Sequence, residues 1–384
     1  MTSDFGTRLN AVDQRTLTPL VRKALKNESA EVIDWSYHPL SGGWSPLTIG
    51  IYRFKGDGRI SEQTVPWSLI LKAAGKIPEA SCDIPAHWSY WKREILAYQS
   101  GILDDLPGDL VAPCCYGVFE YPGEEFWIWL EDVQEEQELW SLERYGLATR
   151  HLGQFNGAYL VNRSIPDEVW LSSGRMLGWL DLGEPTIRNL RNWSKLPLVQ
   201  SLYRDNLERN LRLWAERDRL LKTMSHLPQT FCHHDANQAN LMVRKDEDGH
   251  AQTVAIDWAL AGRGSIGQEI SSTVFRALYT GISASQAKEL VATIFEGYLA
   301  GLRDAGWHGD ARLVRFGYTA TVALAWGVGL PSIFIGQQLN DEGQLREKAP
   351  SYPTDFIDQM ALLQNHLLDL GDEACRLLNT LQLA

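Results

Sequence analysis

The stretch FCHHDANQAN, residues 231–240, decides how this chain is interpreted. It places His233, Asp235 and Asn240 at the spacing His-x-Asp-x-x-x-x-Asn, and a short apolar run further along then ends at Asp257. A carboxylate on a loop can orient a hydroxyl group and accept its proton, whereas an amide oxygen and a second carboxylate can hold Mg²⁺ between the phosphates of ATP. The pattern therefore predicts phosphoryl transfer, with Asp235 at the acceptor and Asn240 and Asp257 at the metal.

The same pattern resembles the catalytic loop of kinases, His-Arg-Asp-x-x-x-x-Asn, with Asp257 in the place of the Asp-Phe-Gly aspartate. His234 stands where that loop has arginine, and Ala259 stands where the later motif has glycine. With these two residues, the sequence resembles the aminoglycoside phosphotransferase and choline kinase-like family of small-molecule kinases. In that family an acidic residue, more usually aspartate, braces the catalytic loop, and here Glu269 takes its place. The resemblance covers roughly residues 35–275.

Upstream of the catalytic loop, the chain has residues that match the family's ATP-binding residues, and they occur in the same order as in the family. Lys72 lies on the predicted strand WSLILKA, residues 67–73, where the family has its phosphate-binding lysine. Glu94 lies on the next predicted helix, where the ion-pair partner of that lysine belongs. A carboxylate that fixes the ammonium toward the α- and β-phosphates gives this pair its physical reason.

Two further segments complete the ATP site that the resemblance implies. SGGWS, residues 41–45, resembles the loop over the phosphates, so Gly43 and Ser45 are expected to bind nucleotide. WLEDV, residues 129–133, resembles the hinge between the lobes. By that resemblance Glu131 offers its C=O and Val133 its N–H to adenine.

The predicted elements fall into a strand-rich region and a mostly helical region, which favour an α+β, two-lobed, protein-kinase-like fold. Residues 1–131 are expected to form an ATP-binding lobe with a five-stranded antiparallel sheet and one helix. Residues 132–384 show helical spacing and are expected to form a larger, mostly helical lobe that carries the catalytic residues and the acceptor pocket. The expected strands are 35–37, 48–54, 67–73, 114–119 and 126–130. The helix expected among these strands begins at Asp83, and a further helix, ahead of the first strand, is expected from Thr18-Pro19.

One uncharged segment, residues 316–340, resembles a membrane span in composition. It contains glycines, threonines and Pro331, which favour a buried helix that ends at this proline. We therefore predict no membrane association for this segment.

Composition narrows the partners and the location. The chain has 36 Lys and Arg against 48 Asp and Glu, a formal net charge of −12 with no basic stripe, which disfavours nucleic acid and anionic membranes as partners. The five cysteines show no metal-binding spacing, and the start MTSDFGTRLN has no apolar signal segment. A reducing, cytoplasmic location is therefore expected. The oligomeric state is left open.

Three other interpretations fit parts of the sequence. A nucleotide-binding pseudokinase of the same fold is disfavoured by the intact Lys72, Asp235, Asn240 and Asp257. A protein kinase is disfavoured because no Ala-Pro-Glu follows Asp257. A dinucleotide enzyme would use GRGSIG, residues 262–267, but helices rather than a second parallel strand are expected after it.

The acceptor is the least determined feature. A small neutral or cationic compound with a free hydroxyl is expected: an amino sugar, an aminoglycoside-like compound, an amino alcohol or a sugar. The net negative charge supports this, as does the acidic run that contains Glu135, Glu136 and Glu138 after the hinge. Tryptophans in the second lobe are candidates for stacking on such a ligand, namely Trp170, Trp179, Trp307 and Trp326.

Overall fold

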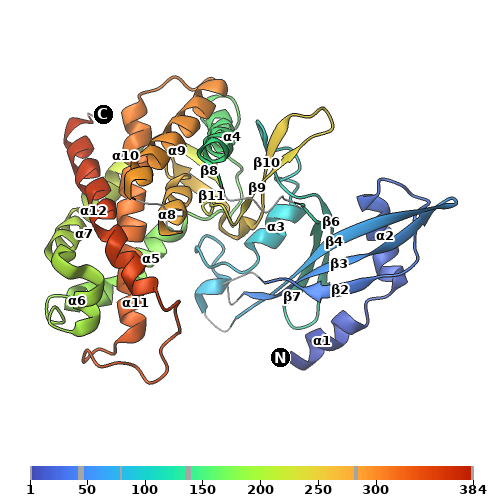
Figure 1. The fold of residues 1–384 in the computed structure, drawn as a ribbon, viewed down its shortest axis with the longest axis horizontal. Coiled ribbons are helices and arrows are strands. Elements are labelled where there is room, and N and C mark those ends of the chain that lie inside the picture. Colours follow the sequence, from blue (N-terminus) through green and yellow to red (C-terminus); the bar gives the residue numbers. More distant parts are fainter. Residues whose placement is uncertain (1, 42–46, 78–79, 135–139, 281–283, 382–384) are drawn as a thin grey trace.

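Two lobes make up the protein, whose structure is a computed structural model. Figure 1 shows a β-sheet beside a larger lobe built mainly of helices, with two further helices on the side of the sheet away from that lobe. The expected α+β class is thereby confirmed. The described residues are 2–41, 47–77, 80–134, 140–280 and 284–381.

The sheet of the first lobe is antiparallel throughout, as expected, and has six strands among the described residues instead of the five expected. Its order is β1-β3-β4-β7-β6, and β2 pairs with β3. The additional strand is the two-residue β1. The strands are β1 (Glu31–Val32), β2 (Ser36–Pro39), β3 (Thr48–Ile60), β4 (Gln63–Gly75), β6 (Cys115–Tyr121) and β7 (Glu125–Glu131).

Strands β3 and β4 form a longer hairpin than the sequence predicted. The strand expected to end at residue 54 continues to Ile60, and the chain turns at Ser61. Gly56 is needed for space rather than for a turn. A Cβ built on it would lie 2.0 Å from the carbonyl oxygen of Asp34, so the neighbouring backbone can approach this closely only at glycine.

The two faces of the sheet have different partners. Trp67, Leu69 and Leu71 of β4 are buried against helices α1 (Thr2–Asn10) and α2 (Gln14–Ala24). Because successive side chains of a strand alternate, Lys72 points to the opposite face, toward the larger lobe.

Helix α2 begins earlier than expected. Its N-cap is Asp13, whose carboxylate accepts a hydrogen bond from the backbone N–H of Thr16 at 2.9 Å, so Thr18 is not the cap. Pro19 lies inside the helix. The burial of Leu17 and Leu20 against the sheet offsets the hydrogen bond that proline removes.

The helix expected from Asp83 is also shorter in the structure. Residues Ala80–Asp83 form a short 3₁₀ turn, and α3 begins only at Arg93 and ends at Gln99. The segment between them folds around the side chain of Arg93, which accounts for its irregular path. Its guanidinium donates hydrogen bonds to the backbone carbonyls of Pro85 and Trp88 at 2.9 Å each.

The second lobe carries most of the helices and two small sheets. The large helices pack around a hydrophobic core that extends to the loop containing Asp235 and to the segment around Asp257. Its helices are α4 (Leu142–Val161), α5 (Arg175–Asn189), α6 (Pro197–Tyr203), α7 (Leu207–His226), α8 (Ser271–Tyr279), α9 (Ala284–Asp304), α10 (Ala311–Thr321), α11 (Leu330–Gln338) and α12 (Phe356–Thr380). In one small sheet β10 (Ala251–Ala255) pairs with β9 (Leu241–Lys245) and with β5 (Leu110–Val111), a strand that comes from the first region of the chain. The other small sheet pairs β8 (Gln229–Cys232) with β11 (Gly262–Ser265).

The uncharged segment forms one long helical element in the middle of this lobe. It runs through α10, a π-helix at Val322–Gly329 and α11, and it is the one described helix that is long and apolar enough to span a membrane. Its most apolar window is 83% buried inside the protein, as expected of a core helix. The predicted end at Pro331 was wrong. The helical backbone continues through Pro331 into α11, directly after the π-helix.

The GRGSIG segment is built into the core of the lobe. Its strand β11 pairs antiparallel with β8, which differs from the parallel strand–helix crossover of a dinucleotide site. A Cβ on Gly262 would lie 1.8 Å from the carbonyl oxygen of Ser172. Gly267 has φ +85°, and a Cβ there would lie 2.1 Å from the carbonyl oxygen of Val314. Close packing therefore explains these glycines.

Candidate active site

The loop between β8 and β9 holds the carboxylate of Asp235 in a fixed position. Asn237 donates its side-chain amide to Oδ1 of Asp235 at 3.0 Å, and Asn240 donates to Oδ2 at 3.1 Å. The side chain of Asp235 is 22% exposed, so it reaches solvent while both of its oxygens remain oriented. Such a carboxylate is suited to receive a proton from a hydroxyl group.

His233 and Glu269 brace this loop from behind. The carboxylate of Glu269 accepts hydrogen bonds from the backbone N–H groups of His233 at 2.7 Å and His234 at 2.9 Å. Nδ1 of His233 accepts from the N–H of Asp235, so its Nε2 carries the proton and donates to the carbonyl of Ile256 at 2.8 Å. Glutamate therefore occupies the bracing position that the family resemblance implied, and the contacts of His233 hold the loop in shape.

Lys72, Glu94 and Asp257 meet although they come from three distant parts of the chain. Nζ of Lys72 lies 2.6 Å from Oε2 of Glu94 on α3 and 2.9 Å from Oδ1 of Asp257 after β10. The Lys72 side chain is 10% exposed. The structure thus brings together the lysine, its expected partner and the expected metal ligand.

The ammonium of Lys72 favours the charged form of both carboxylates, but burial and the charge of Asp257 together hold the pKa of Glu94 above its ordinary value. Burial disfavours the ammonium of Lys72, but the charges of Asp257 and Glu94 outweigh it and hold the pKa of Lys72 above its ordinary value. Partial burial acts to raise the pKa of Asp257, yet the Lys72 ammonium keeps it below its ordinary value. At neutral pH the cluster therefore contains an ammonium ready for phosphate and a carboxylate ready for a cation.

Asp257 and Asn240 offer a donor set that fits Mg²⁺. Asp257 has a left-handed backbone (φ 63°, ψ 66°), and its side chain is 38% exposed despite its contact with Lys72. The backbone N–H of Ile256 donates to the carbonyl of Asn240 at 2.9 Å, which places the two segments next to each other. Carboxylate and amide oxygens are hard ligands of the kind that Mg²⁺ prefers.

The predicted hinge lies at the end of β7, and two ion pairs tie it to both lobes. Glu131 contacts Arg244 of β9, and Oε2 of Glu131 accepts from the backbone N–H of Cys114 at 3.1 Å. Oδ1 of Asp132 accepts a hydrogen bond from Nη2 of Arg53 on β3 at 2.9 Å, and Nε of Arg53 lies 2.8 Å from Oδ2 in the same ion pair. Val133 follows immediately.

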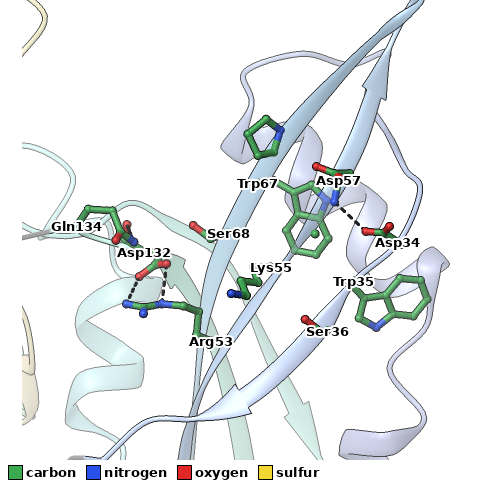
Figure 2. A pocket seen from close by; sticks show the side chains of 12 residues that line it. Asp34, Trp35, Ser36, Arg53, Lys55, Asp57, Trp67, Ser68, Asp132 and Gln134 are labelled. Atoms are coloured by element: carbon green, nitrogen blue, oxygen red, sulfur yellow. Dashed lines mark hydrogen bonds and ion pairs between the residues drawn. The ribbon is translucent and has the colours of Figure 1, made fainter.

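A groove of about 870 Å³ lies on the sheet beside this hinge. Figure 2 shows the side chains that line it. Arg53 points to Asp132 in it, and Lys55 and Ser68 line the wall next to them. Asp235, Lys72 and Asp257 do not line this groove, so it lies apart from the catalytic cluster.

Several residues singled out from the sequence lie outside the described residues. They are Gly43 and Ser45 of the predicted phosphate loop, and Glu135, Glu136 and Glu138 of the acidic run.

One residue at the site was missed in the sequence. Arg175, the first residue of α5, forms an ion pair with Oδ1 of Asp235. Its guanidinium carbon also lies 5.4 Å from the ring centroid of Trp179 and 5.7 Å from that of Trp326. No motif marks Arg175, because its contact with the catalytic loop arises only when α5 folds against that loop.

Residues 104–309 match the model of the phosphotransferase enzyme family. No curated protein matches the chain significantly by sequence. Several solved structures share the fold over nearly the whole chain, which confirms the expected kinase-like architecture.

Three of these structures show which kinds of kinase share the fold. A choline kinase from Cryptosporidium parvum Iowa II has a TM-score of 0.54 and 12% identity, with 95% of this chain and 97% of that chain covered. A spectinomycin phosphotransferase in complex with ADP and spectinomycin has a TM-score of 0.52 and 12% identity, with 95% and 99% covered. A microcompartment-associated aminopropanol kinase has a TM-score of 0.52 and 14% identity, with 95% and 99% covered.

Proposed function

This chain belongs to the phosphotransferase enzyme family, and we propose that it transfers the γ-phosphoryl group of ATP to a hydroxyl group of a small molecule. The observation that carries the proposal is the meeting of Lys72, Glu94 and Asp257 next to the loop that holds Asp235. These residues come from separate segments, and a shared phosphate and metal site gives one reason for all of their contacts.

Each residue has a role that follows from its surroundings. Asp235 orients the acceptor hydroxyl and takes its proton. Lys72, fixed by Glu94, binds the phosphates, and Asn240 and Asp257 hold Mg²⁺. When bound, Mg²⁺ neutralises charge on the phosphate oxygens. Most of the catalysis is then positioning and electrostatic stabilisation.

The remaining parts of the ATP site follow from the family resemblance. The C=O of Glu131 and the N–H of Val133 meet adenine, and Gly43 and Ser45 cover the phosphates. With this arrangement, residues 1–131 form the ATP-binding lobe and residues 132–384 the catalytic and acceptor-binding lobe. The protein is proposed to act in the cytoplasm on a small molecule, without nucleic acid or membrane partners.

Hydroxyl compounds of several kinds are candidate acceptors. From the sequence these are an amino sugar, an aminoglycoside-like compound, an amino alcohol or a sugar. The proteins of shared fold are, by their names, kinases of choline, spectinomycin and aminopropanol. A screen across these classes, with ADP release and product mass as readouts, identifies the acceptor.

The proposal predicts a specific defect in Asp235→Ala. Loss of general-base assistance lowers kcat by roughly 10²–10⁴-fold. The affinity for the Mg²⁺–ATP complex should change little, because Asp235 faces the acceptor. Asp248→Asn, in the exposed turn between β9 and β10, is a control that should keep full turnover. Near-parental kcat in Asp235→Ala would remove this residue from the mechanism.

Changes at Lys72 and Asp257 should impair nucleotide binding itself. Lys72→Met and Asp257→Asn remove the phosphate contact and the metal ligand, respectively. Calorimetry with Mg²⁺ and a non-hydrolysable ATP analogue measures the loss. Lys348→Met, at an exposed position, is the matched control. If both site variants bound the analogue as well as the control does, the ATP site would lie elsewhere.

A further inference from the structure

We propose that Arg175 anchors an oxyanion of the acceptor, so that the preferred acceptor is a small hydroxyl compound that also carries a carboxylate or a phosphate group. This inference rests on the proposed function, because it names the chemistry of the acceptor for the same site. It departs from the cationic acceptors that net charge alone favours.

The guanidinium of Arg175 is held in place at the catalytic carboxylate. It forms an ion pair with Asp235, and it lies within cation–π distance of both Trp179 and Trp326. These two rings are perpendicular, at 89° with 5.0 Å between centroids. Trp326 in turn stacks on Phe275 with 4.0 Å between centroids. The aromatic surroundings therefore fix a cation of the protein where a cationic acceptor would otherwise stack.

Arg175 also retains hydrogen-bonding capacity for a ligand. Its Nε is buried and makes no hydrogen bond with any described residue. Asp235 is the only carboxylate within ion-pair distance in the described part of the chain. A guanidinium has five N–H donors, and a carboxylate or phosphate can take two of them at once. An oxyanion would thus satisfy donors that are costly to leave unpaired.

Among the described residues Asp235 is the acidic side chain that pairs with Arg175, and the small hollow of about 10 Å³ that Arg175 also borders is lined mostly by polar side chains. The side chains that line it with Arg175 include hydroxyls, an amide and an imidazole, and none is acidic. The imidazole of His234 is neutral at pH 7, because burial lowers its pKa to about 4. Arg175 is therefore the one charged group in this lining of described residues, and the carboxylate of Asp235 beside it is the group that an anion would displace. The polar members are His234, Gln268, Ser271, Ser272 and Thr321.

Anion binding would also prepare Asp235 for the reaction. An acceptor oxyanion competes with Asp235 for the guanidinium, and this frees a carboxylate oxygen to face the hydroxyl. The hydroxyl oxygen then forms a bond to the γ-phosphorus while the bond from that phosphorus to the β,γ-bridging oxygen breaks. ADP leaves with that bonding pair, and the hydroxyl proton passes to Asp235. Arg175 thereby couples acceptor binding to activation of the base.

Matched three-carbon alcohols test the inference by binding rather than turnover. Glycerate, glycerol phosphate, glycerol and 3-amino-1,2-propanediol differ mainly in charge. Their dissociation constants are measured by ligand-observed NMR, with the nucleotide site saturated by Mg²⁺–ADP. The proteins are the unchanged chain, Arg175→Gln and the control Arg217→Gln, since Arg217 also lies over a tryptophan, Trp214 at 3.9 Å, but on α7.

We expect an anionic probe to bind the unchanged chain and Arg217→Gln more tightly than the neutral and cationic probes. Binding to Arg175→Gln should be weaker by about tenfold or more, as expected for loss of charged hydrogen bonds. Preference for glycerate identifies a hydroxy acid, and preference for glycerol phosphate identifies a phosphorylated alcohol. Arg175→Lys keeps the charge and should retain part of the anion affinity.

The inference is overturned if no anionic probe binds, if anions bind Arg175→Gln equally well, or if the cationic probe binds most tightly. Affinity for Mg²⁺–ADP serves as the folding control for each variant. Failure of the kinase proposal itself would appear separately, as nucleotide binding that does not depend on Lys72 and Asp257.

Discussion

At the scale of single residues, His233 and His234 are adjacent but differ in environment. His233 links Asp235 to the carbonyl of Ile256, whereas His234 adopts φ 65° and turns its Nε2 to the carbonyl of Arg263 at 3.0 Å. The kinase pattern has arginine at this second position. A neutral, buried histidine here leaves the positive charge at the loop to Arg175.

The buried state of His234 predicts how stability depends on pH. In the unfolded chain its imidazole takes a proton near pH 6.5, but burial lowers its pKa in the folded protein to about 4. The unfolded state therefore binds more protons between these values, and the free energy of unfolding falls as pH falls from 6.5 to 4. The full effect is about 2–4 kcal/mol for this one group.

His234→Gln should reduce this pH dependence. Urea unfolding at pH 7, 5.5 and 4.5 measures the free energy of unfolding for each variant. His226→Gln, at an exposed histidine, should keep the parental slope. Burial also lowers the pKa values of His151 and His366, so a smaller slope of the same sign should remain. An unchanged slope in His234→Gln would show that this imidazole is protonated in the folded state.

At the scale of elements, helix α3 serves both lobes through two consecutive residues. Glu94 binds Lys72 of the sheet, whereas Arg93 reaches the second lobe. The guanidinium of Arg93 is fully buried and donates to the carbonyls of Trp170 at 2.7 Å and Ala259 at 3.0 Å. Ala259 lies two residues after Asp257. The position of the metal ligand is therefore tied to the helix that orients Lys72.

Arg93→Lys tests this tie with a conservative change. An ammonium cannot reach carbonyls on several sides at once, so buried acceptors lose their donors. We expect a loss of about 2–4 kcal/mol in the free energy of unfolding and weaker Mg²⁺–ATP binding. Arg188→Lys, on the exposed side of α5, should change neither. If Arg93→Lys kept parental stability and nucleotide affinity, the carbonyl cluster would be satisfied without a guanidinium.

At the scale of the whole molecule, contacts between motifs that resemble a known family were predictable, and contacts that no motif marks were not. The resemblance of the motifs around Lys72, Glu94 and Asp257 to a known family was sufficient to predict that these three residues meet. The extent of β3 and the late start of α3 were not predictable, because Gly56 and Arg93 are explained by neighbours that the sequence does not place beside them. Arg175 was missed for the same reason.

The hinge also depends on contacts between distant segments, and these suggest how the lobes hold their relative position. Glu131 at the end of β7 pairs with Arg244 of β9, and both side chains are less than a third exposed. A paired, partly buried charge restricts the angle between the proposed lobes more than an exposed pair does. The adenine contacts expected at Glu131 and Val133 would then be preorganised before ATP binds.

Breaking this pair should weaken ATP binding with little effect on chemistry. We expect Arg244→Gln and Glu131→Gln each to raise KM for ATP by about 3–10-fold, equivalent to roughly 0.7–1.4 kcal/mol, and to leave kcat nearly unchanged. The double variant should resemble either single variant, because one shared contact is lost in each case. Arg59→Gln with Glu31→Gln is the control cycle, since that pair is exposed on β1 and β3. Additive effects on KM in the hinge cycle would mean that Glu131 and Arg244 act independently, and that the ion pair does not set the geometry of the ATP site.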